Sequence, residues 1–390
     1  MKIVFYRYGS ICEPDMIEAF QQVGLEVVEE TTEITNKNIS PATQLKLVEE
    51  RIKKEQPLFV FSINFFPVIA DVCSIYKTRY LCWTVDSPVP ELFSKSITHD
   101  TNRIFLFDGG QYEDFAAYNP EHMFHLPLAA ASGRFDKVIR TITPQDKQTY
   151  GADVSFVGSL YSEKDFLQDS SKLTEYTRGF LQALTEATLQ IYGDYIAKDA
   201  ISDKVVAEIK EAFPNFYTPH NPVANSNKYV AAFRYLGYHI AYEERIRTLN
   251  LLAKQFPVTL FTRSDTTPLQ DVICRPGIRT LDEMPKVFHL SKINLNMTVR
   301  PIQTGLPLRI FDILGCGGFL MTNYQAELEE LFEIGVDLEA YGSPEELVDK
   351  CNYYLTHEEE REKIAKKGYE TVKEKHTYLS RIKAMVGVME

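Results

Sequence analysis

The sequence is poor in cysteine pairs, which are the mark of disulfide scaffolds and of many zinc sites. It has 390 residues and six cysteines, and none of them forms a Cys-x-x-Cys pair. They are widely spaced and mostly lie in apolar runs, so the pattern argues against both disulfide and zinc frameworks. We therefore expect reduced, buried cysteines and no metal site, as is typical of a cytoplasmic protein.

Long apolar runs and an excess of positive charge are also missing. No stretch approaches the roughly 20 apolar residues of a membrane span, and the opening MKIVFYRYGS predicts a β-strand, not a signal peptide. We expect no stable membrane insertion. The formal net charge of -12 argues against nucleic acid as a partner, because polyphosphate surfaces call for basic patches. An anionic substrate would need a local cluster of arginines.

The composition that remains is that of a soluble globular protein, with 44% hydrophobic and 25% charged residues. A chain of 390 residues is too long for one core and suits two domains. We predict an α/β fold of two Rossmann-like, doubly wound domains facing a cleft. The predicted ranges are 1–145 for the first domain, 146–375 for the second and 376–390 for a helix that returns to the first.

The first domain shows strand patterns separated by helical spacers. Near-continuous apolar runs such as LFVFSI indicate strands that are buried on both faces of a parallel sheet. The predicted helices are Asp15–Gln22, Ala42–Lys54 and Val68–Lys77. The predicted strands are Lys2–Tyr6, Leu25–Val28, Leu58–Ile63, Tyr80–Val85, Arg103–Phe107 and His122–Leu126.

Polar or glycine residues follow several of these strands at the edge where parallel sheets bind ligands. Gly9 follows the first strand and Asn64 the third, while Trp83 and Asp86 belong to the CWTVDSP stretch of the fourth. We predict that these four residues lie on the acceptor side of a site. Asp86 is equally suited to a turn or helix cap, and Trp83 is equally suited to a core.

The second domain opens with a strand at Asp153–Val157, followed by a loop that contains Ser159. Residues 162–255 are almost entirely helical in pattern and predict an insertion that lines the acceptor side or mediates a homodimer. The sheet resumes at Val258–Asp265, where Arg263 ends a strand, and Arg279 follows in a loop.

The stretch from Ile293 to Asn323 predicts a strand, a polar turn, an amphipathic helix and a second strand. Thr304, Gly305 and Leu306 enter the helix, whose free N–H groups suit a diphosphate. Arg300 and Arg309 flank the turn, and Asp312 follows one helical turn later, where it could accept hydrogen bonds from sugar hydroxyls. Turns of this kind are also common as purely structural features of α/β proteins. The convergence of three charged groups on an apolar segment favours a ligand site.

Residues 292–382 resemble the C-terminal half of a GT-B glycosyltransferase of the group-1 type, and most closely the CgeB-like branch. The stretches NFFPVIADVC, RYLCWTVDSP and NRIFLFDGGQYEDF extend the resemblance to the first half. It implies a nucleotide-sugar donor, with UDP-sugar as the best guess, held by the loop and helix from Thr304 to Asp312 and by a base pocket at Arg279–Met284. The acceptor would be a protein or glycan.

The chain has no Asp-x-Asp motif, with which GT-A enzymes hold a divalent cation. We therefore expect no metal or other cofactor, because arginines would neutralise the leaving group. In an inverting reaction Asp86 is the candidate base, whereas a retaining reaction needs none. The alternative is a two-lobed binding or sensor protein that closes on a phosphorylated or nucleotide ligand without turnover.

Overall fold

Two parallel β-sheets, each of six strands, organise the chain. The computed structural model describes residues 1–37 and 39–388. It divides into two units, which are described separately. The first comprises Met1–Leu128, Tyr217–Ser226 and the described residues from Thr377 onward, and the second comprises Ala129–Phe216 and Asn227–His376. The predicted α/β class with two doubly wound domains is confirmed.

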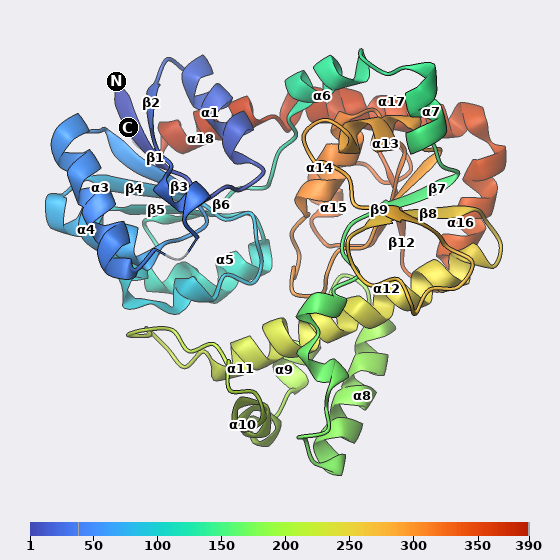
Figure 1. Cartoon of the computed structure of the whole chain (residues 1–390), viewed down its shortest axis with the longest axis horizontal. Coiled ribbons are helices and arrows are strands. Elements are labelled where there is room, and N and C mark those ends of the chain that lie inside the picture. Colours follow the sequence, from blue (N-terminus) through green and yellow to red (C-terminus); the bar gives the residue numbers. More distant parts are fainter. Residues whose placement is uncertain (38, 389–390) are drawn as a thin grey trace. The chain divides into compact units, whose positions relative to one another are not determined.

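The sheet of the first unit has the strand order β2-β1-β3-β4-β5-β6, and every neighbouring pair is parallel (Figure 1). All residues of β3 are buried, as its apolar sequence FVFSI predicts. The strands are β1 (Lys2–Tyr6), β2 (Glu26–Glu30), β3 (Phe59–Ile63), β4 (Arg79–Trp83), β5 (Asn102–Leu106) and β6 (Met123–His125).

Helices of the first unit begin at residues suited to helix starts. Ser40 caps α3 by accepting a hydrogen bond from the Thr43 N–H, and Thr377 forms a capping box with Ser380 at the start of α18. Helix α18 packs against α1. The helices are α1 (Glu13–Gln22), α2 (Thr32–Thr35), α3 (Pro41–Glu55), α4 (Pro67–Tyr76), α5 (Gly109–Phe115) and α18 (Tyr378–Gly387), with short turns of 3-10 helix at Pro90–Phe93, Lys95–Thr98 and Ala116–Tyr118.

The sheet of the second unit has the order β12-β11-β10-β7-β8-β9 and is also parallel throughout. Two of its strands were not predicted. β9 is an edge strand with mainly exposed residues, and β12 has only three residues, so neither shows a recognisable apolar pattern. The strands are β7 (Val154–Val157), β8 (Val258–Thr262), β9 (Ile273–Pro276), β10 (Ile293–Asn296), β11 (Leu320–Asn323) and β12 (Glu339–Tyr341).

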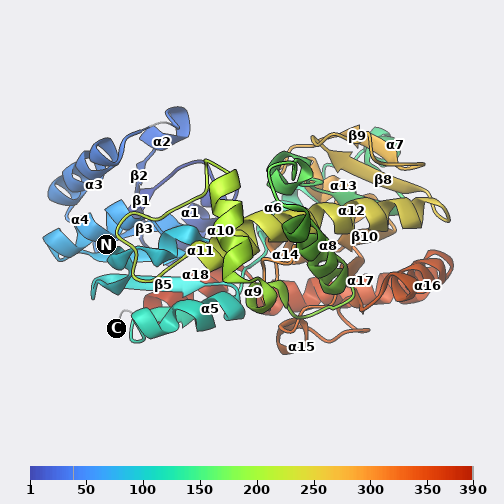
Figure 2. The ribbon, with the colours of Figure 1, turned by 90° about the horizontal axis from the view of Figure 1, so that it is seen from below.

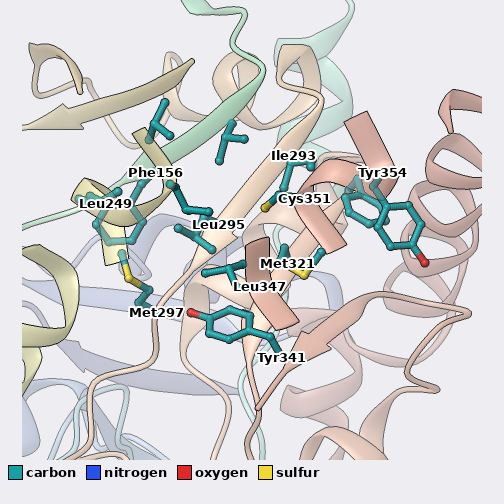
Figure 3. Close-up of a cluster of buried hydrophobic side chains, with 14 of the residues drawn as sticks. Phe156, Leu249, Ile293, Leu295, Met297, Met321, Tyr341, Leu347, Cys351 and Tyr354 are labelled. Atoms are coloured by element: carbon teal, nitrogen blue, oxygen red, sulfur yellow. The ribbon is translucent and has the colours of Figure 1, made fainter. Parts of the chain in front are cut away.

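Figure 3 shows the core of this unit, in which apolar side chains of the central strands pack together with α12 and α16. Phe156, Ile293 and Leu295 come from the strands, Leu249 comes from α12, and Leu347 comes from α16. This core holds the carboxyl ends of β7 and β10 in fixed positions.

The predicted helical insertion, residues 162–255, forms a series of helices in which α8 packs against α12 (Figure 2). A π-helical segment, Val230–Leu236, leads directly into α12. The helices of the second unit are α6 (Ser132–Ile139), α7 (Pro144–Tyr150), α8 (Glu175–Leu189), α9 (Ala197–Ala200), α10 (Asp203–Ala212), α11 (Asn227–Tyr229), α12 (Gly237–Ala253), α13 (Met284–Leu290), α14 (Leu308–Gly315), α15 (Leu328–Leu331), α16 (Pro344–Thr356) and α17 (Glu358–Lys375), with 3-10 turns at Ser162–Lys164 and Phe166–Gln168.

Two segments group differently from the predicted ranges. Residues 129–145, assigned to the first domain by sequence, belong to the second unit, where Asp136 of α6 accepts hydrogen bonds from Tyr369 (2.7 Å) and Lys373 (3.0 Å) of α17. Residues 217–226 leave the insertion and pair within the first unit, where the Val223 N–H donates to the Phe93 carbonyl at 2.6 Å. Across residues 1–37 and 39–388, no helix combines the length and the apolarity needed to cross a membrane.

Candidate functional site

The strand order of the second sheet reverses between β7 and β10. From β7 the chain adds β8 and β9 on one side, and β10, β11 and β12 follow on the other. Ligands of open parallel sheets bind beyond the carboxyl ends of the two strands at such a switch point. The segments that follow these strands are Gly158–Tyr161 and residues 298–307, which we call the β7 loop and the β10 loop.

Arg245 of α12 joins these two strand ends. Its guanidinium donates hydrogen bonds to the Ser159 carbonyl of the β7 loop and, at 2.9 Å, to the Met297 carbonyl that follows β10. The residue is only 8% exposed, and burial lowers the pKa of its guanidinium. The guanidinium also lies 4.5 Å from the centre of the Tyr161 ring. A buried positive charge is thereby held at the switch point.

The β7 loop has a strained backbone at Tyr161, where φ is +68°, a value that residues other than glycine rarely adopt. Ser159 stabilises this turn because its hydroxyl accepts a hydrogen bond from the Tyr161 N–H at 2.7 Å and donates one to Glu163 at 2.5 Å. Lys164 lies over the rings of Tyr161 and Tyr238, at 5.2 and 5.5 Å. The predicted residue Ser159 is therefore at the switch point, but its hydroxyl is engaged within the loop.

Arg309 supplies a second guanidinium from the first turn of α14. It contacts the Met284 sulfur, stacks 5.2 Å from the centre of the Phe288 ring and lies 3.5 Å from the carboxylate of Asp312. Its side chain is 26% exposed, whereas that of Asp312 is 7% exposed. Burial lowers the pKa of Arg309, and the Asp312 carboxylate partly opposes this effect. The helix dipole adds further positive potential at the start of α14.

Charges of both signs surround Arg245. Burial has the largest effect and lowers its pKa, the charge of Arg309 lowers it further, and the charges of Glu244 and Glu163 raise it. Tyr161 interacts electrostatically with both. Guanidiniums that burial removes from water are groups that a bound anion would stabilise.

The β10 loop reaches α14 through the predicted residues Thr304, Gly305 and Leu306. The Thr304 hydroxyl donates to Glu327 at 2.7 Å, the Gly305 carbonyl accepts from Gln325 at 3.4 Å, and Leu306 is 1% exposed. Pro307 stands at the N-cap of α14. Residues that follow β11 thus hold the β10 loop just before α14 begins.

Arg300 differs from the prediction that it contacts a phosphate. Its guanidinium donates to Glu244 of α12 at 2.7 Å and to the Ile191 carbonyl at 2.5 Å, and the residue is 5% exposed. It also stacks on the Tyr192 ring, with 4.7 Å to the ring centre. Its charge is therefore paired with Glu244 of the helical insertion.

The two remaining predicted arginines lie at the surface. Arg279 pairs with Asp282 at 2.8 Å and with Glu283 at 3.2 Å, and its side chain is 67% exposed. The hydrogen bond to Asp282 raises its pKa. Arg263 is exposed after β8, and its side chain packs against Gly277. Neither has a described contact with the β7 or β10 loop.

The first sheet has its own switch point between β1 and β3. Asn64, directly after β3, has a φ of +59°, and its amide donates to Asp86 at 2.7 Å and to the Tyr8 hydroxyl at 3.1 Å. Its side-chain oxygen accepts a hydrogen bond from the Val85 N–H at 3.0 Å. Asp86 is exposed. Burial, and then the charge of Asp86, raises the pKa of Tyr8. The predicted residues Asn64 and Asp86 are thus brought together.

The loop after β1 is rigid although it contains glycine. The N–H groups of Tyr8, Gly9 and Ser10 donate to one carboxylate oxygen of Glu13 at 2.8–3.0 Å. Gly9 has a φ of +92°, and a Cβ there would meet the Lys37 ammonium at 3.1 Å. Glycine is therefore required for the turn.

Trp83 belongs to the core and not to a sugar-binding surface. It has no exposed area, its indole N–H donates to the Leu126 carbonyl at 3.0 Å, and its ring packs edge-on against Tyr378 of α18. The prediction of an acceptor-side role is corrected in favour of the core alternative, because a sugar cannot stack on a ring that has no accessible face.

Sequence reasoning missed Arg245 and its neighbour Glu244, which lay within a helix predicted only in outline. A signal was present. Ile240, Ala241 and Leu249 are buried on α12, and helical spacing of four residues places Glu244 and Arg245 on the same face. Adjacent charges within an apolar stripe indicate a specific partner.

Comparisons with known proteins agree with this architecture. Residues 222–387 match the model of a family described as glycosyl transferase-like. A search of the curated proteins found no significant match. Three solved structures cover 99–100% of this chain at 9–12% sequence identity.

One of them is Anabaena HepE in complex with UDP, with a TM-score of 0.50 and 99% of its chain covered. Another is a glycosyltransferase from Rickettsia africae, at 0.53 and 98%. The third is described as trehalose-6-phosphate from E. coli bound with UDP-2-fluoro glucose, at 0.56 and 98%. Likeness at this identity shows the fold, so the predicted GT-B class is confirmed.

Proposed function

We propose that this chain is a glycosyltransferase that moves a sugar from a nucleotide diphosphate donor to an acceptor hydroxyl. The observation that carries the proposal is the pair of guanidiniums of Arg245 and Arg309 at the switch point of the second sheet. The glycosyl transferase-like match over residues 222–387 supports the same reading.

The donor site in this proposal is formed by the β7 loop, the β10 loop and the start of α14. The diphosphate lies against the N-terminal turn of α14 and against the two guanidiniums. These groups would stabilise the charge that develops on the leaving group, so the proposal calls for no metal ion. Asp312 is 5% exposed in this structure, and we propose that it holds the ribose hydroxyls when Arg309 turns toward the phosphates.

The donor nucleotide is UDP in our proposal, because two of the similar structures contain UDP or a UDP-sugar. The CgeB-like branch, which the sequence resembles, is proposed as the subgroup. The acceptor is a protein or glycan hydroxyl that binds at the first unit, beside Asp86.

In the reaction, the acceptor oxygen forms a bond to the anomeric carbon while the bond from that carbon to the diphosphate oxygen breaks. The diphosphate leaves with the electron pair. In an inverting reaction the proton of the acceptor hydroxyl passes to Asp86, whose carboxylate is oriented by the Asn64 amide at 2.7 Å. In a retaining reaction no such base is needed.

The experiment that tests this function supplies the protein with UDP-, GDP-, TDP- and CMP-sugars. Thermal shift identifies the nucleotides that bind, and release of free nucleotide measures turnover, with and without EDTA. Release of UDP above the uncatalysed rate supports a glycosyltransferase. Binding without release, in the presence of a panel of glycan and peptide acceptors, supports the two-lobed binding protein instead.

A further inference from the structure

The helical insertion touches the β10 loop at residues 300, 301 and 303. We propose that the insertion is the support of this loop, and that Glu244, Gly237 and Lys198 are positioning residues for it. The consequence for catalysis rests on the proposed function, because only then is the β10 loop a donor loop. The mechanical part, that the insertion holds the loop in place, can be tested without a nucleotide.

The first contact is the pair of Glu244 and Arg300. The Arg300 guanidinium donates to the Glu244 carboxylate at 2.7 Å, and the two side chains are 4% and 5% exposed. Arg300 also donates to the Ile191 carbonyl, which follows α8. Arg300 of the loop is therefore bound to two parts of the insertion, and its side chain is almost fully buried.

The second contact is a close approach of backbone to side chain. Gly237, the first residue of α12, lies so near Pro301 that a Cβ at position 237 would stand 2.4 Å from the proline Cγ and 3.0 Å from its Cδ. Such distances require that something moves. The approach occurs where the π-helical segment Val230–Leu236 passes into α12, and π-turns within helices often mark functional positions.

The third contact comes from α9, where the Lys198 ammonium donates to the Gln303 side chain at 2.5 Å. Gln303 is 4% exposed. The loop is thus held at residues 300, 301 and 303, just ahead of the residues that enter α14.

These contacts explain how a loop rich in turns can present Gly305 and the start of α14 in one position. A loop that must bind a diphosphate through backbone N–H groups needs those groups in place before the ligand arrives, because ordering them during binding costs affinity. Loosening any of the three contacts should therefore reduce donor affinity, although none of the positioning residues is proposed to touch the donor.

The test compares two glycine variants of the same insertion. Gly237→Ala places a methyl group against Pro301, whereas Gly179→Ala adds a methyl on the exposed side of α8, where no atom lies within 4 Å. Both changes raise helix propensity. We expect Gly237→Ala to speed amide hydrogen exchange of a peptide covering residues 298–307. We also expect it to weaken UDP binding and raise the donor KM by about tenfold, with a smaller change in kcat. Gly179→Ala should leave all three unchanged.

A second pair of variants keeps the proposal testable if Gly237→Ala does not fold. Lys198→Met removes the contact to Gln303, and Lys172→Met changes an exposed lysine of the same insertion as its control. Loop exchange that equals the wild-type rate in both Gly237→Ala and Lys198→Met would overturn the proposal. Faster exchange with unchanged UDP affinity would overturn its catalytic half. If the wild-type protein binds no nucleotide, the proposed function fails, and loop exchange still decides whether the insertion supports the loop.

Discussion

The structure and the sequence assign different roles to Arg300, and one substitution separates them. The sequence placed it on a phosphate, whereas the structure pairs it with Glu244 at 2.7 Å, with both side chains at most 5% exposed. Removing one partner of a buried ion pair leaves the other charge uncompensated and typically costs about 3–5 kcal/mol. Arg300→Met should therefore destabilise the second unit by about that amount, with a further loss because the Ile191 carbonyl loses its donor.

A double variant shows whether the loss of stability comes from the Glu244 carboxylate that is left buried without its partner. Replacing both partners of a buried pair with apolar residues of similar volume is often neutral or stabilising. Glu244→Leu combined with Arg300→Met should therefore recover most of the stability that Arg300→Met alone has lost. Glu244→Gln alone should be destabilised like Arg300→Met, because it leaves the guanidinium without a countercharge.

Urea unfolding, followed by two signals, is the appropriate assay. The only tryptophan, Trp83, lies in the first unit, so its fluorescence reports on that unit, whereas far-UV circular dichroism reports on both. We expect Arg300→Met to lower the midpoint of the dichroism transition more than that of the fluorescence transition. UDP affinity is then measured by calorimetry on the stable double variant.

The opposite result would refute the reasoning. If Arg300→Met is as stable as the wild type, and if the double variant binds UDP more weakly by about 1.5–3 kcal/mol, then Arg300 contacts the phosphates directly, as the sequence predicted. Recovery of UDP affinity in the stable double variant would instead show that the arginine acts by holding the loop.

Three further predictions follow from the site. Arg309→Ala should weaken UDP binding by about 1.5–3 kcal/mol in calorimetry, since a charge-assisted phosphate contact is lost, and unchanged affinity would place the donor elsewhere. Asp312→Asn should lower affinity for UDP more than for pyrophosphate, and equal losses would leave Asp312 only its pairing with Arg309. Asp86→Asn should reduce turnover about 10²–10⁴-fold with nearly unchanged UDP affinity, whereas wild-type turnover would remove Asp86 as the base.

Most of the fold could be predicted because its signals are local. β3 is buried on both faces, and its sequence is a nearly continuous apolar run. The helices before and after it, α3 and α4, each have a proline in the first turn and end at a residue in the left-handed conformation. β9 and β12 escaped prediction for the complementary reason. They are short strands at the two edges of the sheet, and they are stabilised by pairing with β8 and β11 and not by an apolar pattern of their own.

The candidate site was predicted in part for the same reason. Arg309 and Asp312 sit one turn apart on α14, so helical periodicity alone places them together. The direction in which Arg300 points depends on Glu244, which is 56 residues away in sequence. No local pattern contains that pairing. The apolar stripe of α12 marks Arg245 as a residue with a specific partner, but its partners, the carbonyls of Ser159 and Met297, are backbone groups that have no signature in the sequence.

The two switch points present different groups, and this difference agrees with the roles that we propose for them. Beyond β7 and β10 lie the guanidiniums of Arg245 and Arg309, to which the diphosphate would bind in the proposed function. Beyond β1 and β3, the exposed Asp86 carboxylate is held by the Asn64 amide, and the Lys37 ammonium donates to the Tyr8 carbonyl. A neutral hydroxyl can donate a hydrogen bond to the Asp86 carboxylate. In the proposed function, the second unit supplies the anion site and the first unit supplies the site for the hydroxyl nucleophile. A sugar transfer from a nucleotide diphosphate requires both of these.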